Sequence, residues 1–189
     1  NILKVSYCGP DGCAGFSQEI SQDIVSDSKI LNPELFARKL IELSSSLLPL
    51  KKKPDALTFI VPPENVLLAF HSVSKGETPV QDQLCAEASS KINVPLESLY
   101  FTHFKIAPFV YQFIGVDKDY LESLVKVSNL WGVPIRSVVP WVLLLPKTLP
   151  DSSPSIFVGN FDDKYIVALS ELNGIYFSAS YDEEKTEAE

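Results

Sequence analysis

Few residues in this sequence have a type and spacing that could do chemistry. The two histidines, His71 and His103, each lie in an apolar, alternating segment. This pattern favours a surface or half-buried strand histidine over a metal ligand or a catalytic base. No Cys or His pair has the spacing of metal ligands, and no Gly-x-Ser-x-Gly sequence presents a nucleophilic serine. The sequence therefore predicts no metal site and no catalytic residue of these kinds.

The adjacent carboxylates Asp162 and Asp163 are the remaining catalytic candidates, because they follow a short apolar segment and would lie in a loop. The sequence offers them no evident histidine or metal-ligand partner, so a polar turn between strands is favoured. No Gly-rich phosphate loop of either common pattern occurs. We therefore expect no cofactor.

Composition bounds the class of protein. With 189 residues, 46% of them hydrophobic, the chain is long enough to bury a core, and its net charge of −8 disfavours a nucleic-acid partner. The basic run Lys51–Lys53 is too short for a nucleic-acid footprint, and the apolar run Val138–Pro146 is too short to span a bilayer. Because the chain begins at Asn1 and contains no Met, we expect it to be a piece of a longer protein.

The three cysteines leave two interpretations open. Cys8 and Cys13 are separated by Gly-Pro-Asp-Gly, which is typical of a turn, and Cys85 stands alone. Nothing resembles a signal peptide, so reduced thiols are the favoured interpretation. The alternative is a Cys8–Cys13 bridge across a hairpin.

Turn residues and hydrophobic periodicity predict a mixed α/β chain. The stretch Gly9–Gly12 predicts a β-hairpin, and Asn32 followed by Pro33 predicts the start of a helix that ends at Pro49. The other predicted elements are strand Ala56–Val61 paired with strand Val66–Val73, helix Thr78–Lys91, strands Leu99–Ile106 and Phe109–Val116, a helix from Asp117 to Gly132, and strands Ile156–Gly159, Tyr165–Leu169 and Ile175–Ala179.

The order of these elements resembles the PilM and GspL branch of the actin-like superfamily, which is related to the cell-division protein FtsA. Leu3-Lys4-Val5 is similar to the strand that follows the family's phosphate loop, and Ser26–Glu34 is similar to the entry into its first long helix. The segments Asn93–Leu99 and Tyr120–Pro134 resemble a characteristic turn and helix. By this resemblance the phosphate loop itself would precede Asn1.

The resemblance implies a partial actin-like ATPase fold, with a ribonuclease H-like sheet and an inserted small α+β subdomain. The implied divisions are residues 1–54 and 133–181 for the two parts of the ATPase-like subdomain, 55–132 for the inserted subdomain, and 182–189 for an acidic, flexible tail.

One segment departs from the family pattern. ATP-binding members have an Asp-Ile-Gly sequence followed by small hydroxyl residues, whereas here Phe157 takes the aspartate position. The residues of this vestigial phosphate segment are Gly159, Asn160, Asp162 and Asp163. Two carboxylates close to a triphosphate are unfavourable at low dielectric. We therefore expect neither nucleotide binding nor enzymatic activity.

The resemblance implies a non-enzymatic cytoplasmic scaffold of a type IV pilus or type II secretion-like machine, peripheral to or tethered at the inner membrane. Its partner would be the cytoplasmic tail of an inner-membrane assembly protein, with self-association as a further expectation. Tyr111 and Phe113, alternating on one strand, would suit a peptide-binding groove, and core packing is the alternative. The alternative functions are a weak or vestigial ATPase and a generic protein-interaction adaptor.

Overall fold

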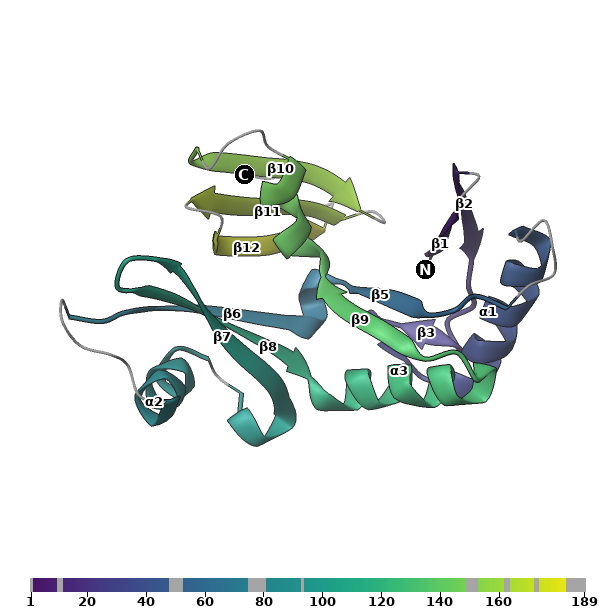
Figure 1. Cartoon of the computed structure of the whole chain (residues 1–189), viewed down its shortest axis with the longest axis horizontal. Helices are drawn as coiled ribbons and strands as arrows, with labels where there is room; N and C mark the ends of the chain where they lie inside the picture. Colours follow the sequence, from purple (N-terminus) through teal and green to yellow (C-terminus); the bar gives the residue numbers. More distant parts are fainter. Residues whose placement is uncertain are drawn as a thin grey trace. The chain divides into compact units, whose positions relative to one another are not determined.

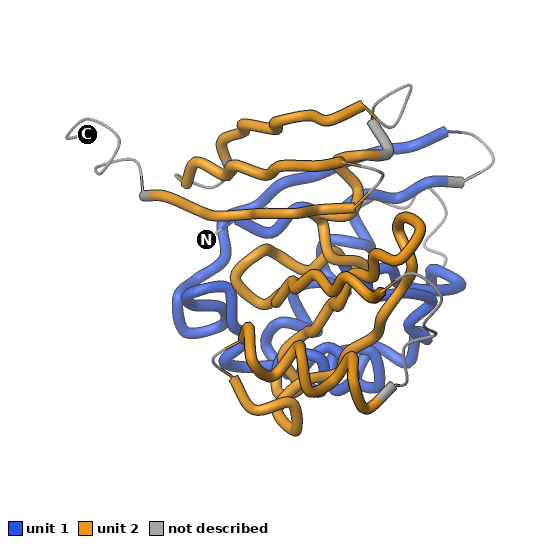
Figure 2. The backbone as a smooth tube through the Cα atoms, turned by 90° about the vertical axis from the view of Figure 1, so that its left-hand side faces the viewer, with its two compact units in different colours: residues 1–59, 120–138 blue, residues 60–119, 139–189 orange. Residues whose placement is uncertain are grey.

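The computed structural model describes residues 2–9, 12–47, 53–74, 81–92, 94–148, 153–161, 164–171 and 174–182. These residues form the mixed α/β structure predicted from the sequence (Figure 1). The chain divides into two compact units, coloured separately in Figure 2. Unit 1 comprises Asn1–Phe59 and Tyr120–Val138, and unit 2 comprises Ile60–Asp119 and Val139–Glu189.

Unit 1 has a core between two helices. Its elements are β1 (Ile2–Gly9), β2 (Gly12–Glu19), β3 (Val25–Ser26), β4 (Lys29–Ile30), α1 (Pro33–Leu47), most of α3 (Lys118–Trp131), and the larger parts of β5 (Leu57–Val61) and β9 (Ile135–Pro140). Asn32 begins α1 as predicted, because its Oδ1 accepts a hydrogen bond from the Leu35 N–H at 3.0 Å. Gly132 follows α3 with a φ of +67°, a left-handed conformation that favours glycine. Buried Phe36 on α1 and Val127 on α3 belong to one hydrophobic cluster.

The pairing predicted for the strand at 56–61 is wrong. Strand β5 pairs with β9, and the Leu57 N–H donates to the Pro134 carbonyl at 2.9 Å. Strand β6 (Val66–Ser72) pairs instead with β8 (Val110–Asp117). The 3-10 turn η1 (Pro63–Asn65) separates β5 from β6, so the chain leaves one strand pair before it enters the next.

Unit 2 contains two antiparallel three-stranded sheets, ordered β6-β8-β7 and β10-β11-β12. Its further elements are α2 (Gln81–Lys91), η2 (Leu96–Ser98), β7 (Leu99–Ala107), η3 (Trp141–Thr148), β10 (Ser155–Phe161), β11 (Lys164–Glu171) and β12 (Gly174–Asp182). Helix α2 packs on β6-β8-β7, where Ala88 and Ile92 contact Ala69 and Phe113. Buried Val142 of η3 packs against the side of the β10-β11-β12 sheet that carries Ala168 and Ile175, and we call this the inner side.

The two compact units are defined by contacts and do not test the subdomain boundaries that the resemblance implies, which stay a prediction. Within the expected subdomain at 55–132, α3 packs into the core of unit 1 and residues 60–119 belong to unit 2. The strands after residue 139 join residues 60–119 in one unit. Residues 183–189 of the expected tail lie outside the described residues.

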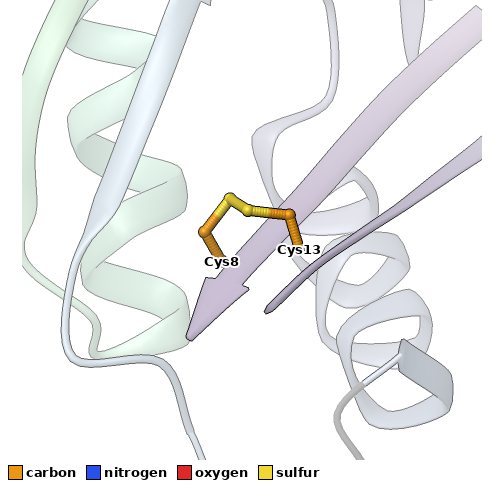
Figure 3. Close-up of a disulfide and its surroundings, with 2 residues drawn as sticks. All are labelled: Cys8 and Cys13. Atoms are coloured by element: carbon orange, nitrogen blue, oxygen red, sulfur yellow. A yellow bond between two sulfur atoms is a disulfide. The ribbon is translucent and has the colours of Figure 1, made fainter. Parts of the chain in front are cut away.

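Cys8 and Cys13 form a disulfide across the β1–β2 hairpin, so the prediction of reduced thiols is corrected for this pair (Figure 3). The hairpin register places the two residues directly opposite each other, with a Cα–Cα distance of 4.1 Å. Opposed positions at this distance lie within reach of a disulfide. Cys85 on α2 is not part of a disulfide.

Loss of this disulfide should destabilise unit 1 moderately. We expect Cys13→Ser to lower the free energy of unfolding by about 2 kcal/mol, because the bridge closes only a short loop in the unfolded chain. Urea denaturation of the variant, with and without reductant, measures this cost. Cys85→Ser is the matched control and should change stability little. An equal loss in both variants would contradict the assignment of the stabilisation to the bridge.

Candidate functional site

Phe157, Gly159 and Asn160 of the segment that departs from the family pattern lie on strand β10. Phe157, at the position of the family's aspartate, packs against the buried cluster on the inner side of the β10-β11-β12 sheet. Its neighbours Ile156 and Val158 point away from that cluster, and each is 69% exposed. A Cβ added to Gly159 would meet no atom within 4 Å. The described residues therefore form no close cradle around this glycine.

Of the other residues of this segment, the structure describes Asn160. Asn160 continues the outward row of β10 and lies opposite Tyr165 of β11. Asp162 and Asp163 lie outside the described residues. Because β10 is an outer strand of its sheet, this part of the chain presents a sheet edge.

The outward row of β10 continues across the whole sheet. The strand registers place nine residues on one face: Ile156, Val158, Asn160, Tyr165, Val167, Leu169, Phe177, Ala179 and Tyr181. We call these nine residues the outer sheet face. None of them carries a charged side chain at neutral pH, and Leu169, Phe177 and Tyr181 are 39%, 48% and 45% exposed. Large apolar and aromatic side chains exposed together on one face are typical of an interaction surface.

Tyr111 and Phe113, predicted to line a peptide groove, lie on β8, the middle strand of the β6-β8-β7 sheet. Phe113 is fully buried in the contact with α2, and its ring stacks on Phe101 with centroids 5.3 Å apart. Tyr111 is half-buried. The core-packing alternative therefore describes Phe113, whose side chain is not available to a partner in this conformation.

His71 is fully buried, in contrast to the surface or half-buried position expected from alternation. Its Nδ1 lies 2.8 Å from Oε2 of Glu87 on α2. Its Nε2 is buried and has no hydrogen-bond partner among the described residues. Glu87 has no signal in the sequence, because no motif joins it to a histidine on another element.

His103 lies beside His71, with ring centroids 5.6 Å apart. Burial lowers the pKa of His103 below its ordinary value, the neighbouring His71 lowers it further, and the Leu84 backbone acts in the opposite direction. The neutral form of His103 is therefore favoured. In the part of the chain that the structure describes, no group of three or more His, Cys, Asp or Glu residues could hold a metal ion.

Within the described ranges, no helix has the length and apolar character needed to cross a bilayer. No protein-family model and no curated protein sequence matches the chain.

Solved structures do match it. A chain of the PilM-PilN type IV pilus biogenesis complex aligns with a TM-score of 0.72 and 14% identity, over 97% of this chain and 60% of that one. The cytoplasmic domain of EpsL, an inner-membrane component of the type II secretion system of Vibrio cholerae, aligns with a TM-score of 0.58 and 16% identity. That alignment covers 77% of this chain and 56% of the EpsL domain. A Bacteroides thetaiotaomicron protein with an actin-like ATPase fold and unknown function aligns with a TM-score of 0.46 and 12% identity, over 94% and 64% of the two chains.

The chain thus spans little more than half the length of the first two structures. At these identities the likeness establishes the fold and not the activity. The chain has the fold shared by these pilus and secretion proteins, and the resemblance to the PilM and GspL branch is confirmed.

Proposed function

We propose that this chain is a non-enzymatic assembly component of a type IV pilus or type II secretion-like machine. It acts at the cytoplasmic side of the inner membrane and holds a cytoplasmic segment of an inner-membrane partner. Two structural similarities support this type of machine and this location. One matched structure is a PilM-PilN complex, and another is the cytoplasmic part of an inner-membrane secretion component.

The observation that carries the non-enzymatic part is the structure of β10. A phosphate site needs a glycine that lets the ligand approach, together with donors or cations around it. Here Phe157 packs into the cluster on one side of the strand, the outward neighbours are aliphatic, and the described residues place no donor or cation within 4 Å of a Cβ added to Gly159. This strand is suited to contact protein and not polyphosphate.

The outer sheet face is the surface that we assign to the partner. Its nine residues include no Asp, Glu, Lys or Arg, although the chain as a whole carries a net charge of −8. An apolar row of a partner segment can therefore pack there without burying an unpaired charge. Aromatic Phe177 and Tyr181 supply the large contact areas that commonly dominate binding energy.

A charge placed on this face should weaken partner binding. We expect Val158→Asp to raise the dissociation constant about tenfold or more, because the carboxylate would be desolvated in the contact. Fluorescence anisotropy with the labelled cytoplasmic segment of the inner-membrane protein encoded beside this chain measures the effect.

Ser180→Asp is the matched control. Ser180 is exposed on the same sheet but pairs with Ile166, whose side chain lies on the inner side. The control should bind like the unmodified chain. Equal affinity of Val158→Asp and the control for the partner segment would show that the partner does not bind this face. A rise in melting temperature on adding ATP and Mg²⁺ would contradict the non-enzymatic assignment.

A further inference from the structure

The β1–β2 hairpin buries little surface of its own. In the described part of the chain its two strands form a separate sheet, and every residue of β2 except Gln18 is exposed. Leu3 and Val5 of β1 pack against the buried cluster of unit 1 and anchor the base of the hairpin. A two-stranded hairpin with so small a buried face is marginally stable in water, so its far end needs a further constraint.

The Cys8–Cys13 disulfide supplies this constraint at the far end of the strands (Figure 3). Side chains alternate along a strand, so Cys8 lies on the face opposite to that of Leu3. Both cysteines are exposed. A thiolate from solution therefore has access to the sulfurs of the bridge.

Folding stabilises this bridge only moderately. The bridge and the fold stabilise each other by the same free energy, because bridge formation and folding are two steps of one thermodynamic cycle. The cysteines are five positions apart, so the loop that the bridge closes is short. The loss expected for Cys13→Ser then corresponds to a bridge favoured by about thirtyfold over that of the unfolded chain. Exposed disulfides are the labile ones, whereas structural disulfides of secreted proteins resist reduction by glutathione.

The two thiols stay close to each other after reduction. Leu3 and Val5 keep the base of the hairpin in register, and the cysteines face each other across the strands with a Cα–Cα distance of 4.1 Å. Closing so short a loop costs little chain entropy. The bridge is therefore able to form again when an oxidant is present.

We propose that Cys8 and Cys13 form a thiol–disulfide exchange site, which reacts with small thiols and disulfides of the glutathione class and whose oxidation state sets the order of the hairpin tip. The hairpin tip comprises residues 6–8 and 13–15. In the oxidised chain the bridge holds the two strands together there. In the reduced chain the tip frays, because its exposed residues bury too little surface to keep it paired.

The exchange proceeds in two displacements. The thiolate of one small thiol attacks a sulfur of the bridge, the S–S bond breaks, and a mixed disulfide forms while the other cysteine leaves as a thiolate. A second small thiolate attacks the small-molecule sulfur of the mixed disulfide and releases the remaining cysteine. Two electrons thus pass to the bridge, the two protons of the small thiols end on the cysteines, and the small thiols leave as their disulfide. The reverse reaction with that disulfide restores the bridge.

The exchange site does not depend on the proposed function, because its chemistry belongs to the isolated chain. At the proposed cytoplasmic location the small-thiol pool would be the reactant. Disulfides of cytosolic proteins are usually transient or redox-sensing, which agrees with an exchangeable bridge at this exposed position.

Thiol counting tests the exchange. The chain carrying Cys85→Ser is equilibrated in glutathione buffers whose ratio of reduced to oxidised form varies about a thousandfold around that of the cytosol, then alkylated and weighed by mass spectrometry. We expect the count of alkylated thiols to rise from zero to two and to return to zero when the ratio is reversed. A count that stays at zero would overturn the proposal, as would a glutathione adduct that persists in place of the bridge. If Cys85→Ser does not fold, peptide mapping of the unmodified chain gives the same count.

Hydrogen exchange tests the consequence for the hairpin. We expect the amides of the hairpin tip to exchange at least about tenfold faster in the reduced chain than in the oxidised chain, while the α1 amides keep their rates. The double variant Cys8→Ser with Cys13→Ser is the matched control, and its tip should exchange fast in both buffers. Equal protection of the tip in the oxidised and reduced chains, or a response to the buffer in the double variant, would overturn the assignment of tip order to the bridge.

Discussion

Replacing Phe113 with alanine should lower the free energy of unfolding of unit 2 by about 3–5 kcal/mol. The side chain is fully buried and contributes to the cluster that joins α2 to the β6-β8-β7 sheet. Its ring also fills the space over Gly115, where an added Cβ would lie 3.0 Å from Cε1 of Phe113. Removing the ring leaves a cavity that small neighbours such as Ala69 and Ala88 cannot fill.

The two tryptophans allow this loss to be measured in one unit. Trp131 lies in unit 1 and Trp141 in unit 2, so urea denaturation in a Trp131→Phe background follows unit 2 by fluorescence. Phe177→Ala is the matched control, because Phe177 is 48% exposed and should cost much less. A Phe113→Ala variant that keeps its stability but no longer binds the partner would instead support the prediction that Phe113 lines a peptide groove.

Local signals predicted the local elements well. The side chain of Asn32 caps α1 and Gly132 ends α3, because capping and left-handed conformations depend on a few neighbouring residues. Pairing between distant strands has no such local signature. The prediction joined the strands at 56–61 and 66–73 because they are neighbours in sequence, whereas β5 finds its partner in β9.

The burial of His71 and the disulfide could not be predicted from local sequence for a related reason. Alternation along β6 suggested a surface or half-buried His71, and only the packing of α2 reveals that the ring is fully buried against Glu87. The absence of a signal peptide favoured reduced thiols over a Cys8–Cys13 bridge. That criterion says nothing about the distance between the two residues. The hairpin register places the two thiols opposite each other.

A second large effect is expected at Gln112, which is fully buried on β8. Its side-chain Nε2 donates to the Ile175 carbonyl at 2.9 Å, and its Oε1 accepts from the Ile175 N–H at 3.2 Å. The amide thus replaces a strand neighbour for one residue of β12. Within unit 2 it connects the β6-β8-β7 sheet to the first residues of the last strand.

Gln112→Leu should therefore destabilise unit 2 by about 2–4 kcal/mol, because it leaves a buried backbone N–H and C=O of Ile175 unpaired while keeping similar volume. The Trp141 fluorescence experiment measures the loss, and exchange of the Ile175 amide should increase in parallel. Thr102→Val, at an exposed residue of β7, is the control and should change stability by less than about 0.5 kcal/mol. If Ile175 stays protected and the stability is unchanged in Gln112→Leu, other groups pair with this backbone and the amide bridge does not hold β12 in place.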